Sequence, residues 1–232
     1  MTGTDAQGAA REAAARAAVD LLEDGMTIGL GSGRAVWRAI ELIGERWAGG
    51  KPPIRSAFAS ERTRELAAAV GIDAVELDGS TRLDLALDGA DELDDDLSLI
   101  KGGGAALLRE KIVVIAAERF VVVAEARKRV ARLGEGFKLP VEVVRFGWPD
   151  TRLRVLELLP DAELRAGPDG APVVTDEGHY LLDCTLPAVD DLGALADSLK
   201  RTVGVVEHGL FIGLASEALL GTPEGEVERI SA

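Results

Sequence analysis

Two carboxylates that follow a short apolar segment are the first residues whose types suggest chemistry. Asp88 and Asp91 lie in the run Asp88-Gly89-Ala90-Asp91-Glu92, directly after the apolar alternation of residues 83–87. Carboxylates at the carboxyl end of a parallel strand lie where open α/β sheets bind their ligands. Crowding raises the pKa of one carboxyl, so that a protonated acid and an ionised base can coexist. The pattern predicts a pair that exchanges protons with a ligand.

A calcium-binding loop is the main alternative for this acidic segment. Such a loop needs glycine at its sixth position and glutamate at its twelfth. The chain has Leu93 and Leu99 at these positions, which excludes that pattern. A solvated acidic turn is the better interpretation for residues 94–96, but not for Asp88 and Asp91.

Three consecutive glycines beside a lysine form a second candidate. Lys101 precedes Gly102, Gly103 and Gly104, and these lead into a helical pattern over residues 105–117. Free backbone N–H groups at the start of a helix attract anions, and the lysine adds a positive charge. The segment therefore predicts a site for a negatively charged group.

Glu110 lies on this predicted helix, seven residues after Gly103, so that both residues should share one face with Ala106 between them. The small residues would leave room for a ligand above the carboxylate, which favours Glu110 as a general base. An exposed glutamate beside Lys111 is the alternative. The neighbouring apolar stripe, which we expect to face the sheet, consists of Leu108, Ile112 and Ile115.

A glycine-rich turn, Gly29-Leu30-Gly31-Ser32-Gly33, is the third candidate. It fails the dinucleotide-binding pattern because Arg34 stands in place of the third glycine, and it lacks the Gly-Lys-Ser/Thr ending of a P-loop. On spacing alone, an anion-binding loop and a plain tight turn remain equally open.

Alternating strands and helices must position these residues. In the first half, strands are predicted at 26–31, 54–59, 74–77, 83–87 and 120–124, and helices at 5–24, 35–47, 60–70 and 105–117, with Ser60 as an N-cap. This alternation is typical of a doubly wound, mostly parallel, Rossmann-like α/β sheet.

The pattern changes after about residue 130. Strands at 141–144, 173–174 and 180–184 and helices at 151–159 and 192–200 predict a small ferredoxin-like α+β domain. The apolar tail from Gly209 is expected to rejoin the first sheet. The predicted domains are residues 1–131 with 209–232, and residues 132–208.

Composition restricts the class of function. The 232 residues include 26 Lys and Arg against 40 Asp and Glu, which gives a net charge of −14. This acidity disfavours nucleic-acid and anionic-membrane partners. We expect a cytoplasmic protein, because no signal peptide or spanning segment is apparent. His179 and His208 lack metal-ligand spacing and are interpreted as a surface and a turn residue, while Cys184 is interpreted as an inert core thiol.

Taken together, these segments resemble the ribose-5-phosphate isomerase family, type A. The block from residue 87 to residue 113 carries most of the specificity, and the glycine turn alone would not suffice. The matching segments are GLGSG at 29–33, LDGADELD at 87–94, LIKGGGAALLREKIV at 99–113, AEARK at 124–128, LPVEVVRFGW at 139–148, VTDEGHYLLD at 174–183 and GVVEHGLFIG at 204–213.

The resemblance implies interconversion of ribose 5-phosphate and ribulose 5-phosphate through a cis-enediolate, in the pentose phosphate pathway, without a metal or organic cofactor. It makes Glu110 the general base and assigns hydroxyl protons and ring opening to Asp88 and Asp91. Lys101 and the glycine amides after it would stabilise the oxyanion. The implied substrate-binding residues are Ser32, Gly33, Arg34, Ala35, Asp88, Gly89, Ala90, Asp91, Lys101, Gly102, Gly103, Gly104 and Lys128. Family members associate as dimers or tetramers, so that a homo-oligomer is expected.

One segment departs from the family pattern. Where the family usually has Gly-Thr-Gly-Ser-Thr, this chain has Gly31-Ser32-Gly33-Arg34-Ala35. The guanidinium of Arg34 can bind a phosphate through two hydrogen bonds, or fill the pocket and alter the choice of substrate. An isomerase of another phosphosugar and a non-catalytic sugar-phosphate-binding protein of the same fold therefore remain as alternatives.

Overall fold

A mostly parallel seven-stranded sheet forms the larger part of the molecule. The computed structural model describes residues 3–232 of the chain. The strand order is β14-β13-β7-β4-β1-β2-β3, and only β14 runs antiparallel to its neighbour. The strands are β1 (Thr27–Leu30), β2 (Arg55–Phe58), β3 (Asp73–Ala74), β4 (Leu85–Asp88), β7 (Phe120–Glu125), β13 (Glu217–Gly221) and β14 (Val227–Ser231).

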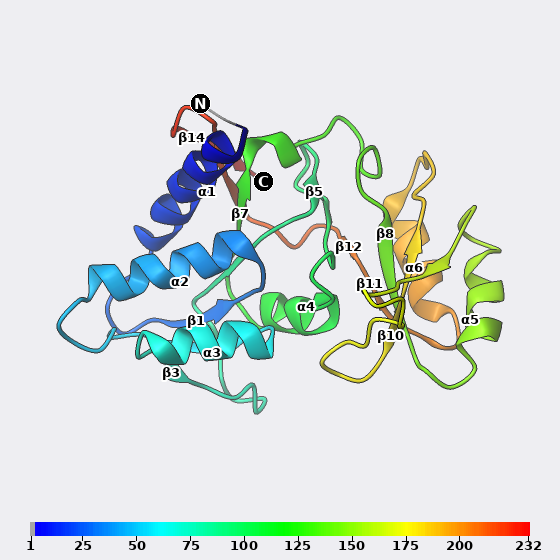
Figure 1. Ribbon diagram of the computed structural model, residues 1–232, viewed down its shortest axis with the longest axis horizontal. Coiled ribbons are helices and arrows are strands. Elements are labelled where there is room, and N and C mark those ends of the chain that lie inside the picture. Colours follow the sequence, from blue (N-terminus) through cyan, green and yellow to red (C-terminus); the bar gives the residue numbers. More distant parts are fainter. Residues whose placement is uncertain (1–2) are drawn as a thin grey trace.

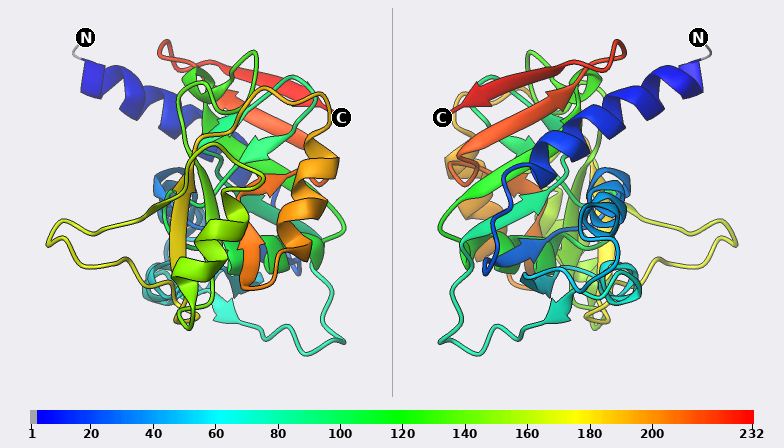
Figure 2. Two further views of the ribbon diagram at one scale, coloured as in Figure 1. Left: turned by 90° about the vertical axis from the view of Figure 1, so that its right-hand side faces the viewer. Right: turned by 90° about the vertical axis from the view of Figure 1, so that its left-hand side faces the viewer.

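Helices cover both faces of this sheet (Figure 1). They are α1 (Gly3–Val19), α2 (Arg34–Arg46), α3 (Glu61–Ala69) and α4 (Leu107–Ile115). Successive strand residues point to opposite faces, so that Leu85 and Leu87 share a core with α1 and α2, while Ala86 faces a second core with Val114 of α4. Figure 2 shows α1 running along β13 and β14, with which it is in contact. The parallel strands are therefore buried on both sides, except for the edge strand β3, whose two residues are exposed.

A second unit follows in the chain and lies on the right in Figure 1. Its four-stranded antiparallel sheet has the order β11-β8-β10-β9, and two helices accompany it. The elements are β8 (Leu139–Val143), α5 (Trp148–Val155), β9 (Glu163–Leu164), β10 (Tyr180–Cys184), α6 (Leu192–Arg201) and β11 (Val205–His208). Its core includes Val141, Leu182 and Leu199.

A short third sheet connects the two units. It has the order β12-β6-β5, with β5 (Glu92–Leu93), β6 (Leu99–Ile100) and β12 (Leu210–Phe211). A 3₁₀ turn, η1 (Ala126–Lys128), follows β7. Because β12 directly follows β11 of the small sheet, the chain crosses from one unit to the other beside Lys101.

The predicted α/β alternation is confirmed, and most elements lie within a few residues of their expected positions. The strand predicted at 173–174 is wrong, because Val174 forms only an isolated bridge with Tyr180. The strand that pairs with β10 at one edge of the small sheet is instead β9, which comes earlier in the chain, and β11 forms the other edge. His208, expected in a turn, is buried at the end of β11, a strand that was not predicted.

The apolar stripe predicted on α4 is also wrong. Ile112 and Ile115 are 50% and 65% exposed. Leu107 and Val114 face the interior instead, and Glu110 shares this buried face. Ala105 has a φ of +62°, the helix begins at Leu107, and the side that it buries carries Leu107, Glu110 and Val114.

Candidate active site

A cavity of about 350 Å³ lies at the carboxyl ends of β1, β4 and β7. This is the edge at which open α/β sheets bind ligands. Its wall comes from the glycine turn, the acidic segment, the triple-glycine loop, α1, α4 and the end of β7. The lining residues are Arg11, Ser32, Gly33, Arg34, Ala35, Trp37, Gly89, Ala90, Asp91, Lys101, Gly102, Gly103, Gly104, Glu110, Ala124, Glu125, Lys128 and Phe137.

Asp88 ends β4 directly beneath this cavity and is 1% exposed. Its Oδ1 accepts hydrogen bonds from the N–H groups of Ser32, at 3.1 Å, and Gly89, at 2.7 Å. Gly31 lies so close that a Cβ there would stand 1.9 Å from the carboxyl carbon. The first glycine turn is therefore shaped to fit around a buried carboxylate.

Lys101 lies between two buried carboxylates. Its Nζ is 3.0 Å from Oδ2 of Asp88 and 3.3 Å from Oε2 of Glu110, and it donates a 2.6 Å hydrogen bond to the carbonyl of Gly89. Lys101 is 3% exposed and Glu110 is 4% exposed. One ammonium group thus forms ion pairs with two carboxylates that are almost completely buried from water.

This arrangement changes the acidity of all three groups. Burial and the neighbouring charge of Asp88 raise the pKa of Glu110 to about 8. Burial also raises the pKa of Asp88, against the attraction of Lys101. For Lys101, burial favours the neutral amine, but the carboxylates of Asp88 and Glu110 outweigh it and raise the pKa. The cluster thus holds a permanent cation beside a carboxyl that titrates close to neutral pH.

Asp91 lies on the cavity wall opposite the triple-glycine loop. Its Oδ2 accepts a 2.7 Å hydrogen bond from the N–H of Gly103. A Cβ at Gly103 would lie 2.7 Å from Oδ1 of Asp91 and 2.9 Å from the ring of Phe137. Gly103 precedes α4 rather than lying on it, so that the predicted shared helix face is wrong. The loop nevertheless brings Gly103 and Glu110 to the same cavity.

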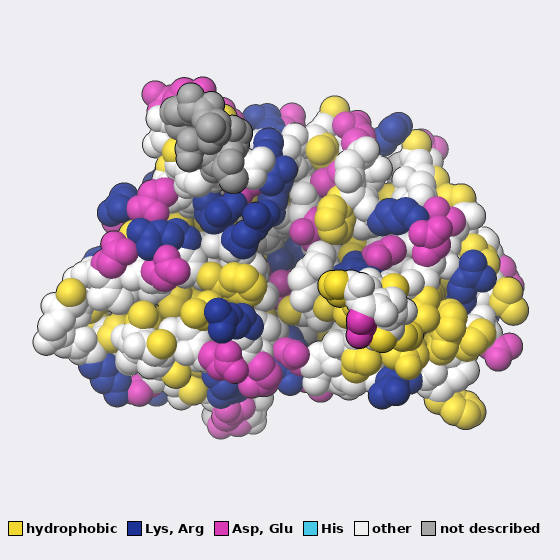
Figure 3. Space-filling view, in the orientation of Figure 1, with side chains coloured by type: hydrophobic (Ala, Val, Ile, Leu, Met, Phe, Trp, Pro, Cys, Tyr) yellow, Lys and Arg dark blue, Asp and Glu magenta, His cyan; other side chains and the backbone are white. Residues whose placement is uncertain are grey.

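Positive side chains from three separate segments line the outer part of the cavity. Arg11 comes from α1 and pairs with Glu125 at 2.7 Å, Arg34 opens α2, and Lys128 donates a short hydrogen bond to the carbonyl of Ala90. Burial lowers the pKa of Lys128. Figure 3 shows Lys and Arg side chains gathered beside the hollow between the two units. We call Arg11, Arg34 and Lys128 the cationic wall.

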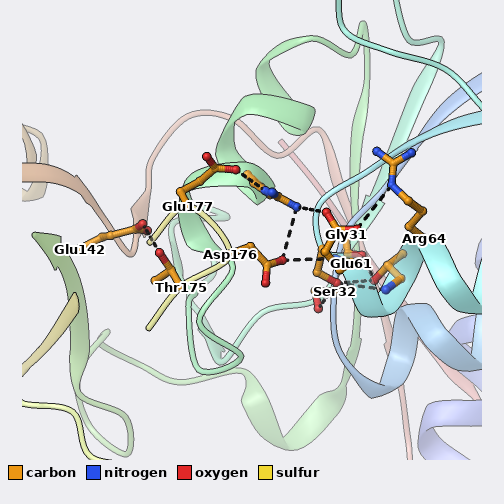
Figure 4. Close-up of polar contacts among 11 residues, drawn as sticks. Gly31, Ser32, Glu61, Arg64, Glu142, Thr175, Asp176 and Glu177 are labelled. Carbon is orange, nitrogen blue, oxygen red and sulfur yellow. Dashed lines mark hydrogen bonds and ion pairs between the residues drawn. The ribbon is translucent and has the colours of Figure 1, made fainter. Parts of the chain in front are cut away.

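Helix α3 supports the glycine turn from outside, and the small unit contacts α3 and α4 beside it (Figure 4). The hydroxyl of Thr63 on α3 donates a 2.8 Å hydrogen bond to the carbonyl of Gly31. Arg109 of α4 forms ion pairs with Glu61 of α3, at 2.7 Å, and with Glu177 of the small unit, at 2.5 Å. A residue that joins the two units, Arg109, is therefore the immediate neighbour of Glu110 in the chain.

All the site residues expected from the sequence line the cavity except Asp88, which lies beneath its surface and contacts the lining residues Ser32, Gly89 and Lys101. Arg11, Trp37, Ala124, Glu125 and Phe137 were not expected. In the sequence, the one hint of a function for Arg11 is that it is a cation in an alanine-rich helix. Only the packing of α1 against the strand ends brings Arg11 to the cavity.

Other residues with possible reactivity lie away from the cavity. Cys184 is in the core of the small unit, as predicted, and burial raises the pKa of its thiol to about 12. His179 lies at the partly exposed surface and approaches Glu142 at 2.9 Å. In residues 3–232, no group of three or more His, Cys, Asp or Glu side chains is arranged to hold a metal ion. None of the described helices is both long and apolar enough to cross a membrane.

Comparison with known proteins identifies the family. The family model of ribose 5-phosphate isomerase A (phosphoriboisomerase A) matches residues 57–225. The chain belongs to this family. Ribose-5-phosphate isomerase A from Synechococcus sp. (strain JA-3-3Ab) is 47% identical over 216 residues, which cover 93% of this chain and 94% of that one. By this relationship the chain is a ribose-5-phosphate isomerase.

Solved structures of the family share this fold. Ribose 5-phosphate isomerase from Plasmodium falciparum matches with a TM-score of 0.91 and 30% identity, over 96% of this chain and 97% of that one. A D-ribose-5-phosphate isomerase in complex with phospho-erythronic acid matches with a TM-score of 0.89 and 35% identity, over 96% and 97%. The family-model match includes Asp88, Lys101 and Glu110, whereas Arg34 lies before its first residue.

Proposed function

We propose that the chain interconverts ribose 5-phosphate and ribulose 5-phosphate with Glu110 as the base. The carboxylate takes the proton from carbon 2 of the open-chain aldose, and the resulting cis-enediolate is reprotonated at carbon 1. The observation that carries this proposal is the buried Glu110 on the cavity wall, whose pKa is raised to about 8. A base with a pKa near the working pH is the most effective in such transfers.

The negative charge of the enediolate needs positive partners that are in place before the reaction. The ammonium of Lys101 and the amides of Gly102–Gly104 surround the inner end of the cavity. Because these groups are fixed and shielded from water, they stabilise charge without having to reorganise. We infer that they hold the oxyanion on the reacting carbons.

The two aspartates are assigned to the remaining proton transfers. Asp91 lies on the cavity wall and contacts Gly103, so that it can exchange protons with sugar hydroxyls and assist ring opening. Asp88 does not line the cavity itself; it contacts the N–H groups of Ser32 and Gly89, and its one side-chain partner on the cavity wall is Lys101, at 3.0 Å. Its part in hydroxyl transfer therefore passes through the ammonium, and it also keeps that ammonium charged.

We assign the phosphate to the cationic wall and the start of α2. The amides of Gly33, Arg34 and Ala35 belong to the first turn of that helix or precede it, where unpaired N–H groups favour an anion. Ser32, whose N–H is donated to Asp88, lines the same part of the cavity with its hydroxyl side chain. Phospho-erythronic acid, bound in a relative, carries a phosphate at one end and a carboxylate at the other. We infer that it binds here, with its carboxylate in place of the enediolate and its phosphate at the cationic wall.

A substitution of the base tests this proposal. Glu110→Gln preserves the size of the side chain but cannot accept the carbon-bound proton. We expect turnover to fall at least 10³-fold, on the scale of a lost general base, while the affinity for phospho-erythronic acid stays within about threefold. Near-normal turnover in this variant would reject Glu110 as the base. Activity that is lost in EDTA and restored by a divalent ion would contradict a reaction without metal.

Isomerisation of another phosphosugar is the second candidate, and the observation that favours it is Arg34 on the cavity wall. A panel of aldose phosphates of five and six carbons, with ketose formation as the readout, separates the two. Turnover of another sugar without ribose 5-phosphate would overturn the named substrate and leave the mechanism intact. Binding without any turnover in the whole panel would favour a non-catalytic sugar-phosphate-binding protein.

We further propose a cytoplasmic homo-oligomer, either dimer or tetramer, which light scattering would test. The fold is assigned as a Rossmann-like domain of residues 1–131 and 209–232 with a ferredoxin-like domain of residues 132–208. The strand order β11-β8-β10-β9 with two helices supports the second assignment. Residues 1 and 2 of the first domain lie outside the described residues.

A further inference from the structure

Arg165 directly follows strand β9 of the small unit, and its side chain reaches the triple-glycine loop of the active site. Its Nη1 donates hydrogen bonds to the carbonyl oxygens of Gly102, at 2.8 Å, and Gly103, at 3.3 Å. Its Nε and Nη2 bind the two carboxylate oxygens of Asp183 on β10, at 2.9 Å and 2.5 Å. The guanidinium is therefore held in place by the small sheet and donates hydrogen bonds to two consecutive carbonyls of the loop.

The direction of these carbonyls determines where the next N–H groups point. The described residues contain no cis peptide bond. In a trans peptide, the C=O of one residue and the N–H of the next point in opposite directions. With the carbonyls of Gly102 and Gly103 turned toward Arg165, the N–H groups of Gly103 and Gly104 point away from it. The N–H of Gly103 agrees with this, because it donates to Asp91 on the cavity wall.

The N–H of Gly104 is the group that this arrangement leaves available. Gly104 is exposed and lines the cavity, and its N–H has no acceptor in the part of the chain that the structure describes. Backbone N–H groups in such loops bind anionic oxygens, and because the N–H of Gly103 is already donated to Asp91, Gly104 supplies the one that is free between these two residues. The free N–H of Gly104 is thus suited to an oxyanion that forms in the cavity.

A chain of three glycines does not hold this orientation by itself. Glycine has no Cβ and reaches left-handed and right-handed conformations with similar ease, and Gly102 already has a φ of +104°. Rotation of one peptide plane would turn a carbonyl oxygen toward the substrate in place of an N–H. The double contact with Arg165 opposes that rotation from outside the loop.

We propose that Arg165 is a positioning residue of the isomerase: it orients the Gly103–Gly104 peptide so that the N–H of Gly104 meets the oxyanion of the enediolate. This inference rests on the proposed function, in which the loop amides stabilise that charge. It also gives the small unit a direct part in catalysis, through a side chain that does not itself touch the substrate.

Two substitutions of Arg165 test the proposal. Arg165→Met keeps the length of the side chain and removes every donor, while Arg165→Lys keeps the charge but cannot span Asp183 and both carbonyls. We expect Arg165→Met to lower kcat about 10- to 100-fold, below the loss of a whole oxyanion donor. KM should change less than about twofold, because the contact is made mainly in the transition state. Arg165→Lys should recover part of kcat.

The affinity of the Arg165 variants for phospho-erythronic acid distinguishes a positioning role from a merely structural one, because a structural role alone would leave this affinity unchanged. Its carboxylate carries charge where the enediolate does, so that its dissociation constant should rise by a factor similar to the loss in kcat. Arg152→Met is the matched control. Arg152 also lies in the small unit and donates to a backbone carbonyl, that of Ala162, but it does not line the cavity. We expect its kcat and KM to stay within about twofold of the parent values.

The outcomes separate this inference from the proposed function. A raised KM with unchanged kcat in Arg165→Met, or equal losses in the Arg165 and Arg152 variants, would overturn the positioning role. Should Arg165→Met fail to fold, Asp183→Asn loosens the same guanidinium and should give a smaller fall in kcat at unchanged KM. Full turnover in Glu110→Gln would reject the proposed function, whereas an inactive Glu110→Gln with a fully active Arg165→Met rejects this inference alone.

Discussion

Glu110 and Lys111 are neighbours on α4, both are buried, and they belong to two different charge clusters. Glu110 shares Lys101 with Asp88, so that two carboxylates compete for one cation. Lys111 instead donates three hydrogen bonds, to Glu207 Oε1 at 2.8 Å and to the carbonyls of His208 and Leu210 at 2.9 Å each. In the first cluster, two carboxylates share a single cation. In the second, all three N–H groups of Lys111 have acceptors, and Glu207 is paired.

The acidity of the two glutamates follows this difference. The pKa of Glu110 is raised to about 8 by burial and by Asp88. Burial also favours the neutral form of Glu207, but Lys111 and the hydrogen bonds from Lys200 outweigh it and lower its pKa to about 2. Burial alone therefore does not make a catalytic carboxyl, and what matters is whether its charge is fully paired. Phe211 lies between the clusters, with its ring 5.5 Å from Nζ of Lys101 and 4.7 Å from Nζ of Lys111.

Removal of the cation from the first cluster should have the largest effect. In Lys101→Met, Asp88 and Glu110 lose their shared partner, so that their charged forms become still less favourable and the oxyanion loses its ammonium. We expect kcat to fall about 10³-fold, as measured by ketose formation at pH 8. A fall below tenfold would show that Lys101 does not carry the transition-state charge. Thermal unfolding of the variant provides the control for folding.

Removal of the cation from the second cluster should affect folding more than catalysis. Lys111→Met leaves Glu207 paired with Lys200, at 2.7 Å, but leaves the carbonyls of His208 and Leu210 without their donor. We expect a loss of about 3 kcal/mol in the free energy of unfolding, at the lower end for a broken buried pair. Urea denaturation measures it. A change in kcat larger than that in Lys101→Met would contradict the division between the two clusters.

The pH dependence of activity and stability should sharpen the same contrast. Glu110 must be ionised to act as a base, so that kcat/KM should rise up to tenfold per pH unit and level off above about pH 8. Its folded-state pKa exceeds the ordinary value of 4.5, so that its stabilising contribution is present below pH 4.5 and is lost as the pH rises through 8. The contribution of Glu207 runs the other way: it is present above pH 4.5 and is lost as the pH falls toward 2.

Denaturation of Glu110→Gln and Glu207→Gln across this pH range checks both signs. Relative to the parent protein, Glu110→Gln should become more stable as the pH rises from 5 to 9. Glu207→Gln should be less stable than the parent above pH 4.5, and this difference in the free energy of unfolding should disappear as the pH falls from 4.5 to 2. Parallel curves for the two variants would mean that the two glutamates do not differ in the way described.

The sequence was sufficient for elements and groups that depend on local pattern. Alternating apolar residues and the glycine and N-cap signals predicted the α/β order, and the structure confirms Ser60 as the N-cap of α3. Asp88, Asp91 and Lys101 could be singled out because each lies within a few residues of a strand end or a glycine run. The buried face of α4 could not be predicted, because apolar residues occur all around this helix and contacts with other segments decide that Glu110 is buried while Ile112 and Ile115 are exposed.

The amino-acid sequence by itself determined the family, the alternation of strands and helices, and the presence of a base, two acids and a lysine in one central block. Only the tertiary structure decided that Arg11 of α1 joins the cationic wall, that Arg165 of the small unit grips the glycine loop, and that Glu110 competes with Asp88 for Lys101. The physical reason is that secondary structure follows from neighbours along the chain, whereas acidity and orientation depend on distances between segments that only folding brings together.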